Sequence, residues 1–388
     1  MLKHQLKLLL SAASLLLAAA APAQEPLKVG MVVEMSGPFA DIGRQIMNGA
    51  RAYLKAHGDV VAGRRIVLIV KDTTGMAPDV AKRQAQELIT NDKVDFLAGF
   101  GLTPNALSVA PLATEAKKPM VIMNAATSII TTRSPYIARV SMTLPQVTAP
   151  LATWALNNGV KQVYTLVADY GPGIDAETQF KKTFTAGGGQ IVGSLRTPPN
   201  NPEFAPFLQR IKDARPQALF IFLPQGEQPV AIMKGFAERE LDKAGIKLIA
   251  TGDVTEDSLI EAMGNAPLGV VTTHQYSVAH DSAQNRAFLK AYADISAGRP
   301  NFMAVGGWDG MAAIYEVAKR LEGKIDGDRA MEVLKGMKID SPRGPIVIDP
   351  ATRDVVQTIY VRRVERLKDG KLYNVEFDQV QNVKDPGK

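Results

Sequence analysis

Two hydroxyl-bearing turns follow neighbouring apolar runs of the sequence. Thr103-Pro104 comes after the run at 94–98 and a sharp glycine turn, and Thr127 lies in the loop after the run at 120–123. Threonine is a good N-cap and proline suits the first helical position, so a helix is predicted to start here. In a parallel α/β sheet such turns lie side by side at the carboxyl edge, and free N–H groups at a helix start suit a carboxylate. The turns therefore predict an anion site; ordinary βα turns with well-chosen caps are the alternative interpretation.

The rest of the chain supplies the elements that would position these turns. The first half predicts strands at 27–33, 66–70, 94–98, 120–123 and 137–140, and helices at 41–57 and 80–89 and after Thr103. The pattern restarts at Leu144-Pro145. The second half predicts strands at 163–168, 190–195, 218–223, 247–250, 346–348 and 355–364, and helices at 147–156, from the loop at 170–173 to about 184, and at 204–211, 230–237, 286–295 and 310–321. Strands alternating with helices of this length predict βαβ units and parallel sheets. The tail at 382–388 is expected to be frayed.

The first 23 residues are typical of a secretory signal peptide. A basic start precedes an apolar run at 8–21 that is too short to span a membrane comfortably, and Ala21-Pro22-Ala23 fits an A-x-A cleavage site. The mature chain is therefore predicted to begin at Gln24, and an uncleaved membrane anchor is the alternative. The sequence contains no cysteine, which excludes a lipoprotein anchor, a disulfide framework and a thiolate metal site. We expect a periplasmic protein that is not lipid-anchored.

Composition narrows the function classes. Loss of Lys3 and Lys7 with the signal would lower the formal net charge from +6 to +4. The sequence contains no block of Lys and Arg, and only 6% of its residues are aromatic, so nucleic acid is not expected as a partner. The histidines show no metal spacing. A Gly-x-Ser-x-Gly turn, typical of α/β hydrolases, is missing. We therefore predict no catalytic residues, no metal and no cofactor, and a secreted hydrolase is a minor alternative.

Five short motifs carry a family resemblance through their order and spacing along the chain. They lie at 29–38, 99–103, 124–127, 169–171 and 307–310. Together with the leader, they make the mature chain resemble the periplasmic leucine/isoleucine/valine-binding family, the solute-binding components of branched-chain amino acid type ABC importers.

The resemblance implies an α/β fold of two Rossmann-like lobes with parallel-sheet cores joined by three hinge crossovers, which is the type I periplasmic binding protein fold. The implied N-terminal lobe comprises 24–142 and 273–346, and the C-terminal lobe comprises 143–272 and 347–388. Hinges are expected near 141–145, 272–275 and 346–350, where large backbone changes would close the lobes on a ligand. A monomer that delivers its ligand to an inner-membrane permease is implied, and a ligand sensor for a membrane receptor is the alternative.

The resemblance also implies roles for particular residues. Thr103 and Thr127 would hold a ligand carboxylate, the carbonyl of Ala125 would accept from an ammonium, and Tyr170 would close over the ligand. The full set of expected ligand contacts is Ile42, Leu102, Thr103, Ala125, Ala126, Thr127, Tyr170, Gln225, Asp253 and Met303.

Three positions depart from the family pattern and leave the ligand open. The family often has an aromatic residue at Ile42 and a tyrosine at Gln225, and its acidic partner for the ammonium aligns at Gly252 or, with a one-residue shift, at Asp253. A buried ammonium without a carboxylate is costly. If Asp253 faces the cleft, a hydrophobic amino acid is a suitable ligand; if it does not, a small aromatic or aliphatic acid is the better prediction.

Overall fold

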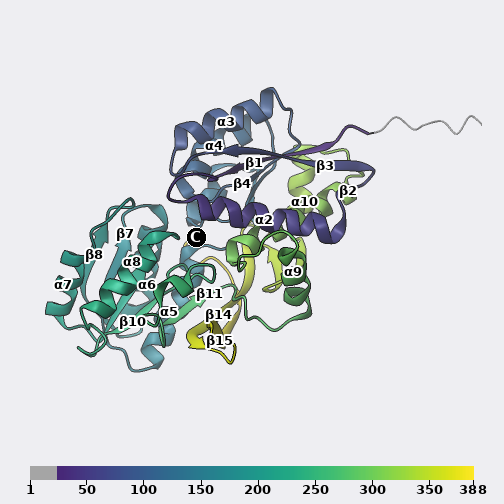
Figure 1. Ribbon diagram of the computed structural model, residues 1–388. Coiled ribbons are helices and arrows are strands. Elements are labelled where there is room, and N and C mark those ends of the chain that lie inside the picture. Colours follow the sequence, from purple (N-terminus) through teal and green to yellow (C-terminus); the bar gives the residue numbers. More distant parts are fainter. Residues whose placement is uncertain (1–23) are drawn as a thin grey trace, which may run out of the picture.

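The computed structural model describes residues 24–388, which form two α/β lobes beside each other (Figure 1). The predicted signal peptide lies outside the described residues. The first lobe contains a six-stranded sheet that is parallel except for the β2–β3 pair. In spatial order its strands are β2 (Val60–Val61), β3 (Arg64–Asp72), β1 (Leu27–Val33), β4 (Phe96–Gly99), β5 (Met120–Ile122) and β6 (Ile137–Arg139).

Six helices of residues 24–388 belong to this lobe by their contacts. They are α2 (Ala40–His57), α3 (Pro78–Thr90), α4 (Thr103–Glu115), α9 (Ala283–Ala293), α10 (Phe302–Arg320) and α11 (Gly327–Leu334). The last three come late in the chain, yet α9 and α10 pack on α2 (Figure 1). Helix α11 packs on α10 and β6. The chain therefore returns to the first lobe after building most of the second.

The second sheet combines a parallel core with an antiparallel end. Its strands, in order, are β12 (Lys338–Ser341), β13 (Gly344–Ile348), β14 (Val355–Arg366), β11 (Val271–His274), β10 (Lys247–Thr251), β9 (Ala218–Phe222), β7 (Gln162–Ala168) and β8 (Gln190–Thr197), with β15 (Leu372–Val383) also paired to β14. Strands β7 to β11 are parallel, whereas β14 is antiparallel to β11, β13 and β15. The helices of this lobe are α5 (Leu144–Asn157), α6 (Gly171–Ala186), α7 (Ala205–Ala214) and α8 (Glu227–Glu238). Short 3₁₀ segments occur at Ser128–Arg133 (η1) and Ile260–Met263 (η2).

The central predicted strands form because their side chains are buried on both faces. Every residue of β9 (ALFIF) and of β4 (FLAG) is buried, as expected for parallel strands covered by helices on both sides. The first predicted strand, 27–33, coincides with β1. On α2 the spacing of Ile42, Ile46 and Ala50 places these side chains on one buried stripe.

Helix α10 begins at Phe302, about two turns before the predicted start at 310. The Asn301 side chain accepts hydrogen bonds from the N–H groups of Met303 and Ala304, which caps the helix. Gly307, inside this helix, serves for close packing: a Cβ atom there would lie 2.1 Å from the carbonyl oxygen of Ile46 on α2. Glycine therefore allows α10 and α2 to approach closely, at a cost in helix propensity.

The C-terminal tail is not frayed, and that prediction is corrected. Strand β15 was not predicted, and it carries the chain back beside β14. Beyond it, Lys384 pairs with Asp349 at 2.8 Å, and Asp385 accepts a hydrogen bond from Ser128 at 3.0 Å. The C-terminus lies between the two lobes in Figure 1. Hydrogen bonds and ion pairs thus hold the tail against the body of the protein.

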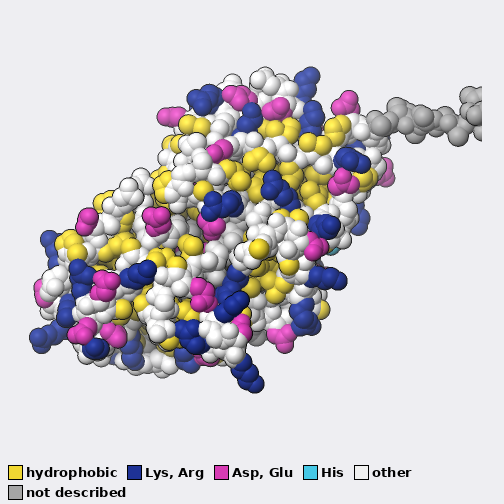
Figure 2. Space-filling model, viewed as in Figure 1, with side chains coloured by type: hydrophobic (Ala, Val, Ile, Leu, Met, Phe, Trp, Pro, Cys, Tyr) yellow, Lys and Arg dark blue, Asp and Glu magenta, His cyan; other side chains and the backbone are white. Residues whose placement is uncertain are grey.

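Three segments carry the chain between the lobes, and they lie at or beside the three predicted hinges. They follow β6, β11 and β13; the last counts as a crossover because β12, although it belongs with β13 to the second sheet, packs on α9 and α10 of the first lobe. Bending at these segments, and the exact lobe boundaries, stay predictions. On the face drawn in Figure 2, Lys and Arg side chains are interspersed with Asp and Glu and form no broad basic patch. Within residues 24–388, each helix is too short or too polar to cross a lipid bilayer.

Candidate ligand-binding site

A small cavity lies between the lobes, where the carboxyl ends of strands from both sheets meet. The side chains around it leave little free volume in this structure. Its lining residues are Gly101, Leu102, Thr103, Asn124, Ala126, Met142, Leu144, Tyr170, Pro172, Phe222, Gln225 and Asp253. They come from the start of α4, the loop after β5, the segment between β6 and α5, the start of α6, and the ends of β9 and β10. Parallel α/β sheets usually bind ligands at this edge.

One end of the cavity is built for an anion. Helix α4 begins at Thr103 itself, so the prediction that Thr103 is the N-cap is off by one residue; Leu102 occupies that position without a side-chain cap. The Thr103 hydroxyl is instead 2.9 Å from the hydroxyl of Thr127, and both side chains are buried. The start of α6 faces the same pair, since a Cβ atom on Gly171 would lie 2.9 Å from the Thr127 hydroxyl oxygen. Two helix N-termini and two hydroxyls thus converge, which favours a carboxylate.

Asp253 provides the acid of the cavity, on the turn after β10. It is 1% exposed, and the Gln225 amide donates a hydrogen bond to its Oδ1. Its Oδ2 has no hydrogen-bond partner among the described residues and lies 3.6 Å from Nε2 of His274. Burial lowers the pKa of His274 to about 4 despite the neighbouring Asp253, so the imidazole is neutral at pH 7. An unpartnered buried carboxylate oxygen is costly, so this atom is suited to accept a hydrogen bond from a ligand.

The wall near Asp253 is aromatic. The rings of Tyr170 and Phe222 stack with centroids 6.1 Å apart and an interplanar angle of 25°. Burial, with the negative charge of Asp253, raises the pKa of Tyr170 above its ordinary value, so the phenol stays neutral. Leu102 and Leu144 add apolar surface. Apolar walls with a few placed polar groups are typical of small-molecule sites.

The structure brings most of the predicted contacts together. Leu102, Thr103, Ala126, Tyr170, Gln225 and Asp253 line the cavity, and Thr127 contacts Thr103. The other three predicted contacts are buried but do not line it. Ile42 packs beneath the turn at Gly101, the N–H of Ala125 donates to the Phe100 carbonyl at 2.9 Å, and the N–H of Met303 is held by the cap of α10. A ligand contact by these three residues stays a prediction.

The prediction missed several lining residues. They are Gly101, Asn124, Met142, Leu144, Pro172 and Phe222. Gly101 and Asn124 belong to the two turns already singled out, where the Asn124 amide donates to the Gly101 carbonyl at 2.9 Å. Phe222 ends β9 and therefore carried a usable signal, because residues at the carboxyl ends of parallel strands face the ligand edge. Met142 and Leu144 gave no such signal, because they lie where the chain leaves the first lobe.

The chain is similar to known proteins over nearly its whole length. A family model described as "Periplasmic binding protein" matches residues 26–371. Leu/Ile/Val-binding protein homolog 6 of Brucella melitensis biotype 1 is 43% identical over 374 residues, covering 96% of each chain.

Solved structures resemble the chain over nearly its whole length. The solute-binding protein of an ABC transporter from Rhodopseudomonas palustris BisB5, in complex with 3,4-dihydroxybenzoic acid, is 55% identical with a TM-score of 0.91, covering 94% of this chain and 99% of that one. A counterpart from R. palustris HaA2, in complex with p-hydroxybenzoic acid, is 43% identical with a TM-score of 0.92 and the same coverage. The leucine-binding protein of Thermotoga maritima, 23% identical with a TM-score of 0.80 over 92% of this chain and 99% of its own, shares the fold.

Proposed function

Because the chain belongs to the periplasmic binding protein family, we propose that it captures a hydroxylated benzoate between its two lobes and delivers it to an inner-membrane ABC permease. The family and fold predicted from the sequence are confirmed, and the protein is a solute-binding protein of ABC transporter type, not an enzyme. The ligand class and the delivery step form the proposal.

The observation that carries the proposal is the free carboxylate oxygen of Asp253. A phenolic hydroxyl on the ligand would donate to Oδ2, while Gln225 keeps Oδ1 occupied. A hydrogen bond to a charged group contributes about 1.5–3 kcal/mol. A plain benzoate would leave this oxygen unpaired, so a 4-hydroxyl group is expected to increase affinity.

The remaining parts of such a ligand also have chemical counterparts among the residues in and beside the cavity. The carboxylate would accept hydrogen bonds from Thr103 and Thr127 and face the N-termini of α4 and α6. The ring would lie against Tyr170 and Phe222, where offset or edge contacts between aromatic rings are favourable. A flat acid with polar groups at opposite ends of one ring uses each feature of the site.

An amino acid uses the site less well. Its ammonium is attached next to the carboxylate and needs acceptors beside Thr103. The predicted acceptor residue, Ala125, does not line the cavity, and the carbonyl of Ala126 already accepts from the N–H of Leu144 at 3.0 Å. Asp253 does line the cavity, where a carboxylate can pair with an ammonium, so an amino acid remains the second candidate. The relatives that are 55% and 43% identical were solved with hydroxybenzoates, which favours the aromatic acid.

Periplasmic residence, closure by the three crossovers and a monomeric state are proposed with this function. The contact between Thr127 and the start of α6 indicates that the lobes lie close together in this structure. A sensor role would use the same site, and a pull-down against permease and chemoreceptor partners distinguishes transport from sensing.

Calorimetry on the full-length mature protein tests the ligand class. Titrations with 4-hydroxybenzoate, 3,4-dihydroxybenzoate, benzoate and leucine should give tight binding of the hydroxylated acids, about ten- to a hundredfold weaker binding of benzoate, and no leucine binding. In Asp253→Asn the preference for 4-hydroxybenzoate over benzoate should shrink by about tenfold, because the acceptor loses its charge.

Asp257→Asn is the matched control, since Asp257 is a buried acid of the same segment that does not line the cavity. It should leave the preference unchanged. Tight leucine binding that is lost in Asp253→Asn would favour the amino acid and contradict the proposal. If Asp253→Asn keeps the full preference for 4-hydroxybenzoate over benzoate, another group accepts the hydrogen bond from the phenolic hydroxyl.

A further inference from the structure

A buried arginine stands directly behind the carboxylate end of the cavity. Arg139 ends β6 and is fully buried. Its Nη2 donates to the carbonyl of Thr127 at 2.6 Å, and its Nη1 donates to the carbonyl of Met142 at 3.1 Å. One guanidinium group therefore holds both the loop that carries the Thr127 hydroxyl and the segment by which the chain leaves the first lobe.

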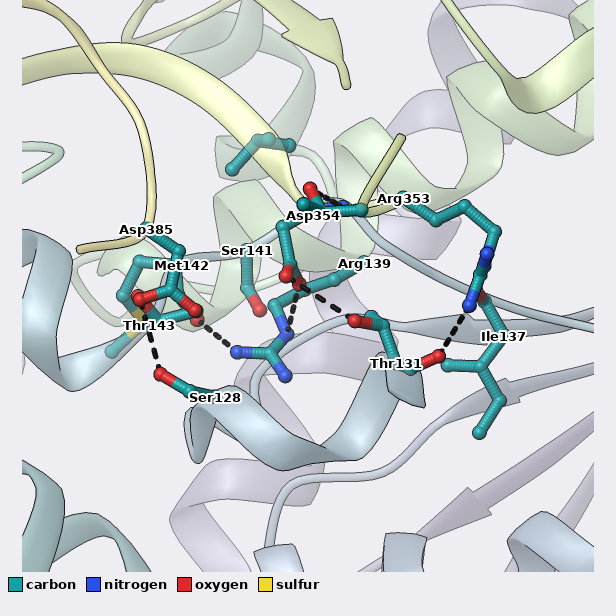
Figure 3. Close-up of polar contacts among 12 residues, drawn as sticks. Ser128, Thr131, Ile137, Arg139, Ser141, Met142, Thr143, Arg353, Asp354 and Asp385 are labelled. Carbon is teal, nitrogen blue, oxygen red and sulfur yellow. Dashed lines mark hydrogen bonds and ion pairs between the residues drawn. The ribbon is translucent and has the colours of Figure 1, made fainter. Parts of the chain in front are cut away.

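The same guanidinium is tied to a second crossover. Nε of Arg139 lies 3.3 Å from Oδ1 of Asp354, and the Arg139 backbone N–H donates to the carbonyl of Arg353 at 2.9 Å. Asp354 is 3% exposed and lies directly before β14. Figure 3 shows the Arg139 side chain reaching toward Asp354 on one side and Met142 on the other. Arg139 thus joins the Thr127 loop and the segment after β6 to the segment before β14, which is distant in the chain.

The C-terminal tail completes this network. The terminal Lys388 ammonium contacts both Asp354 and the hydroxyl of Thr131, and Thr131 itself donates to Asp354 at 3.2 Å. Ser128, next to Thr127, donates its hydroxyl to Asp385 of the tail and its backbone N–H to Asp175 on α6 at 2.9 Å. The loop at 127–131 is therefore held by the tail and by the second lobe as well as by Arg139.

We propose that Arg139, anchored by Asp354, is a positioning residue for ligand capture: it fixes the Thr127 loop relative to two of the crossovers, so that the carboxylate site is preformed when the lobes close. This inference rests on the proposed function for the carboxylate-bearing ligand. Arginine is suited to the role because its rigid fork donates in several fixed directions, whereas lysine concentrates its charge on one atom. Fixed supporting groups of this kind raise affinity by removing the cost of ordering the site.

The test is Arg139→Lys, which keeps the charge and removes the fork. The variant should bind 4-hydroxybenzoate and benzoate about tenfold more weakly than the parent, with an unchanged ratio between the two ligands, because Arg139 acts on the carboxylate end. Amide hydrogen exchange of residues 124–131 in the ligand-free protein should become faster. Asp354→Asn, a milder change of the same network, should shift affinity and exchange in the same direction.

Arg64→Lys is the matched control. Arg64 also pairs with an aspartate, Asp95 at 2.7 Å, and donates to the backbone carbonyls of Pro26 and Gly323, but none of these partners belongs to the loop at 124–131. This control should lower stability without changing affinity or exchange at 124–131. If Arg139→Lys behaves like Arg64→Lys, Arg139 is merely structural and the inference is overturned.

Failure of the proposed function remains distinguishable. If the parent binds leucine instead of the benzoates, the ligand class is wrong, yet leucine carries the same carboxylate and the Arg139 comparison is made with it. If Arg139→Lys does not fold, Asp354→Asn decides the matter: unchanged affinity and unchanged exchange at 124–131 in that variant would overturn the inference.

Discussion

The hydroxyl oxygens of Thr103 and Thr127 lie 2.9 Å apart, although 24 positions separate them in the chain. They meet because β4 and β5 are parallel neighbours, so the segments that follow them emerge at the same edge of the sheet. Neither hydroxyl caps the helix that follows it. A ligand carboxylate can therefore replace the hydrogen bond that joins the two hydroxyls, which makes this pair the first target for mutation.

Thr103→Val should weaken the binding of every carboxylate ligand by about ten- to a hundredfold, because it removes one hydrogen bond to a charged group and nearly preserves the side-chain shape. Calorimetry measures the loss, and circular dichroism checks the fold. Thr114→Val in the same helix removes a hydroxyl that donates to Ser134 at 2.7 Å outside the cavity, and should leave affinity unchanged. Equal affinities for Thr103→Val and the parent would show that the ligand carboxylate does not bind at this turn.

Gly171→Ala tests closure of the lobes. The added methyl group would lie 2.9 Å from the Thr127 hydroxyl and 3.5 Å from the Thr103 methyl group, across the space that the lobes must close. Overpacking of this kind costs about 1–3 kcal/mol, so ligand binding should weaken by about tenfold. Small-angle scattering should show ligand-induced compaction in the parent and less compaction in the variant.

Gly298→Ala is the control for this prediction, since a Cβ atom there would make only an ordinary 3.5 Å contact with Ser296. It should bind and compact like the parent. A parent whose scattering profile is unchanged by saturating ligand would contradict the hinge-closure model itself.

Glu256 predicts a pH dependence of stability. It is buried and accepts hydrogen bonds from Asn301, the cap of α10, at 2.8 Å and from the Ser258 hydroxyl, which also donates to Asp41 on α2. Burial raises the pKa of Glu256 from 4.5 to about 7, although these hydrogen bonds oppose the shift and Asp41 adds to it. Between pH 4.5 and 7 the folded protein therefore binds more protons than the unfolded chain, so the free energy of unfolding falls as pH rises through this window.

Glu256→Gln should reduce this pH dependence and raise the free energy of unfolding at pH 8 by up to about 3 kcal/mol. Urea denaturation at pH 5 and pH 8 measures the effect. Some dependence should persist, because burial also raises the pKa of Glu34 to about 7 and that of Asp309 to about 6. Equal pH dependence in the variant and the parent would show that Glu256 does not release its proton in this range.

Export should remove the first 23 residues and leave Gln24 at the N-terminus, because the apolar run is short and an A-x-A site follows it. N-terminal sequencing of protein recovered from the periplasm of the expressing cells identifies the new end. Ala23→Asp, which spoils the cleavage site, should leave the precursor uncleaved and membrane-associated. Recovery of intact Met1 from a membrane fraction of the unmodified protein would overturn the prediction.

The sequence alone determined the alternation of strands and helices and the two hydroxyl turns. These features depend on local spacing: a run such as 218–222 is apolar at every position, and the side-chain periods of strands and helices differ. Local spacing was insufficient at the start of α10. The helix begins at Phe302 and not at the predicted 310, and Gly307 lies inside it because a residue without a Cβ atom lets α10 pass close to α2.

Only the tertiary structure decided which of these side chains act together. The sequence left Asp253 facing either the cavity or another partner, whereas the fold places one of its oxygens on Gln225 and leaves the other unpartnered beside the cavity. Likewise, Arg139 and Asp354 lie far apart in the chain, and their pairing follows from the path of two crossovers. Such pairings depend on how whole lobes pack, and burial makes them strong by excluding water, so no local pattern of residues can specify them.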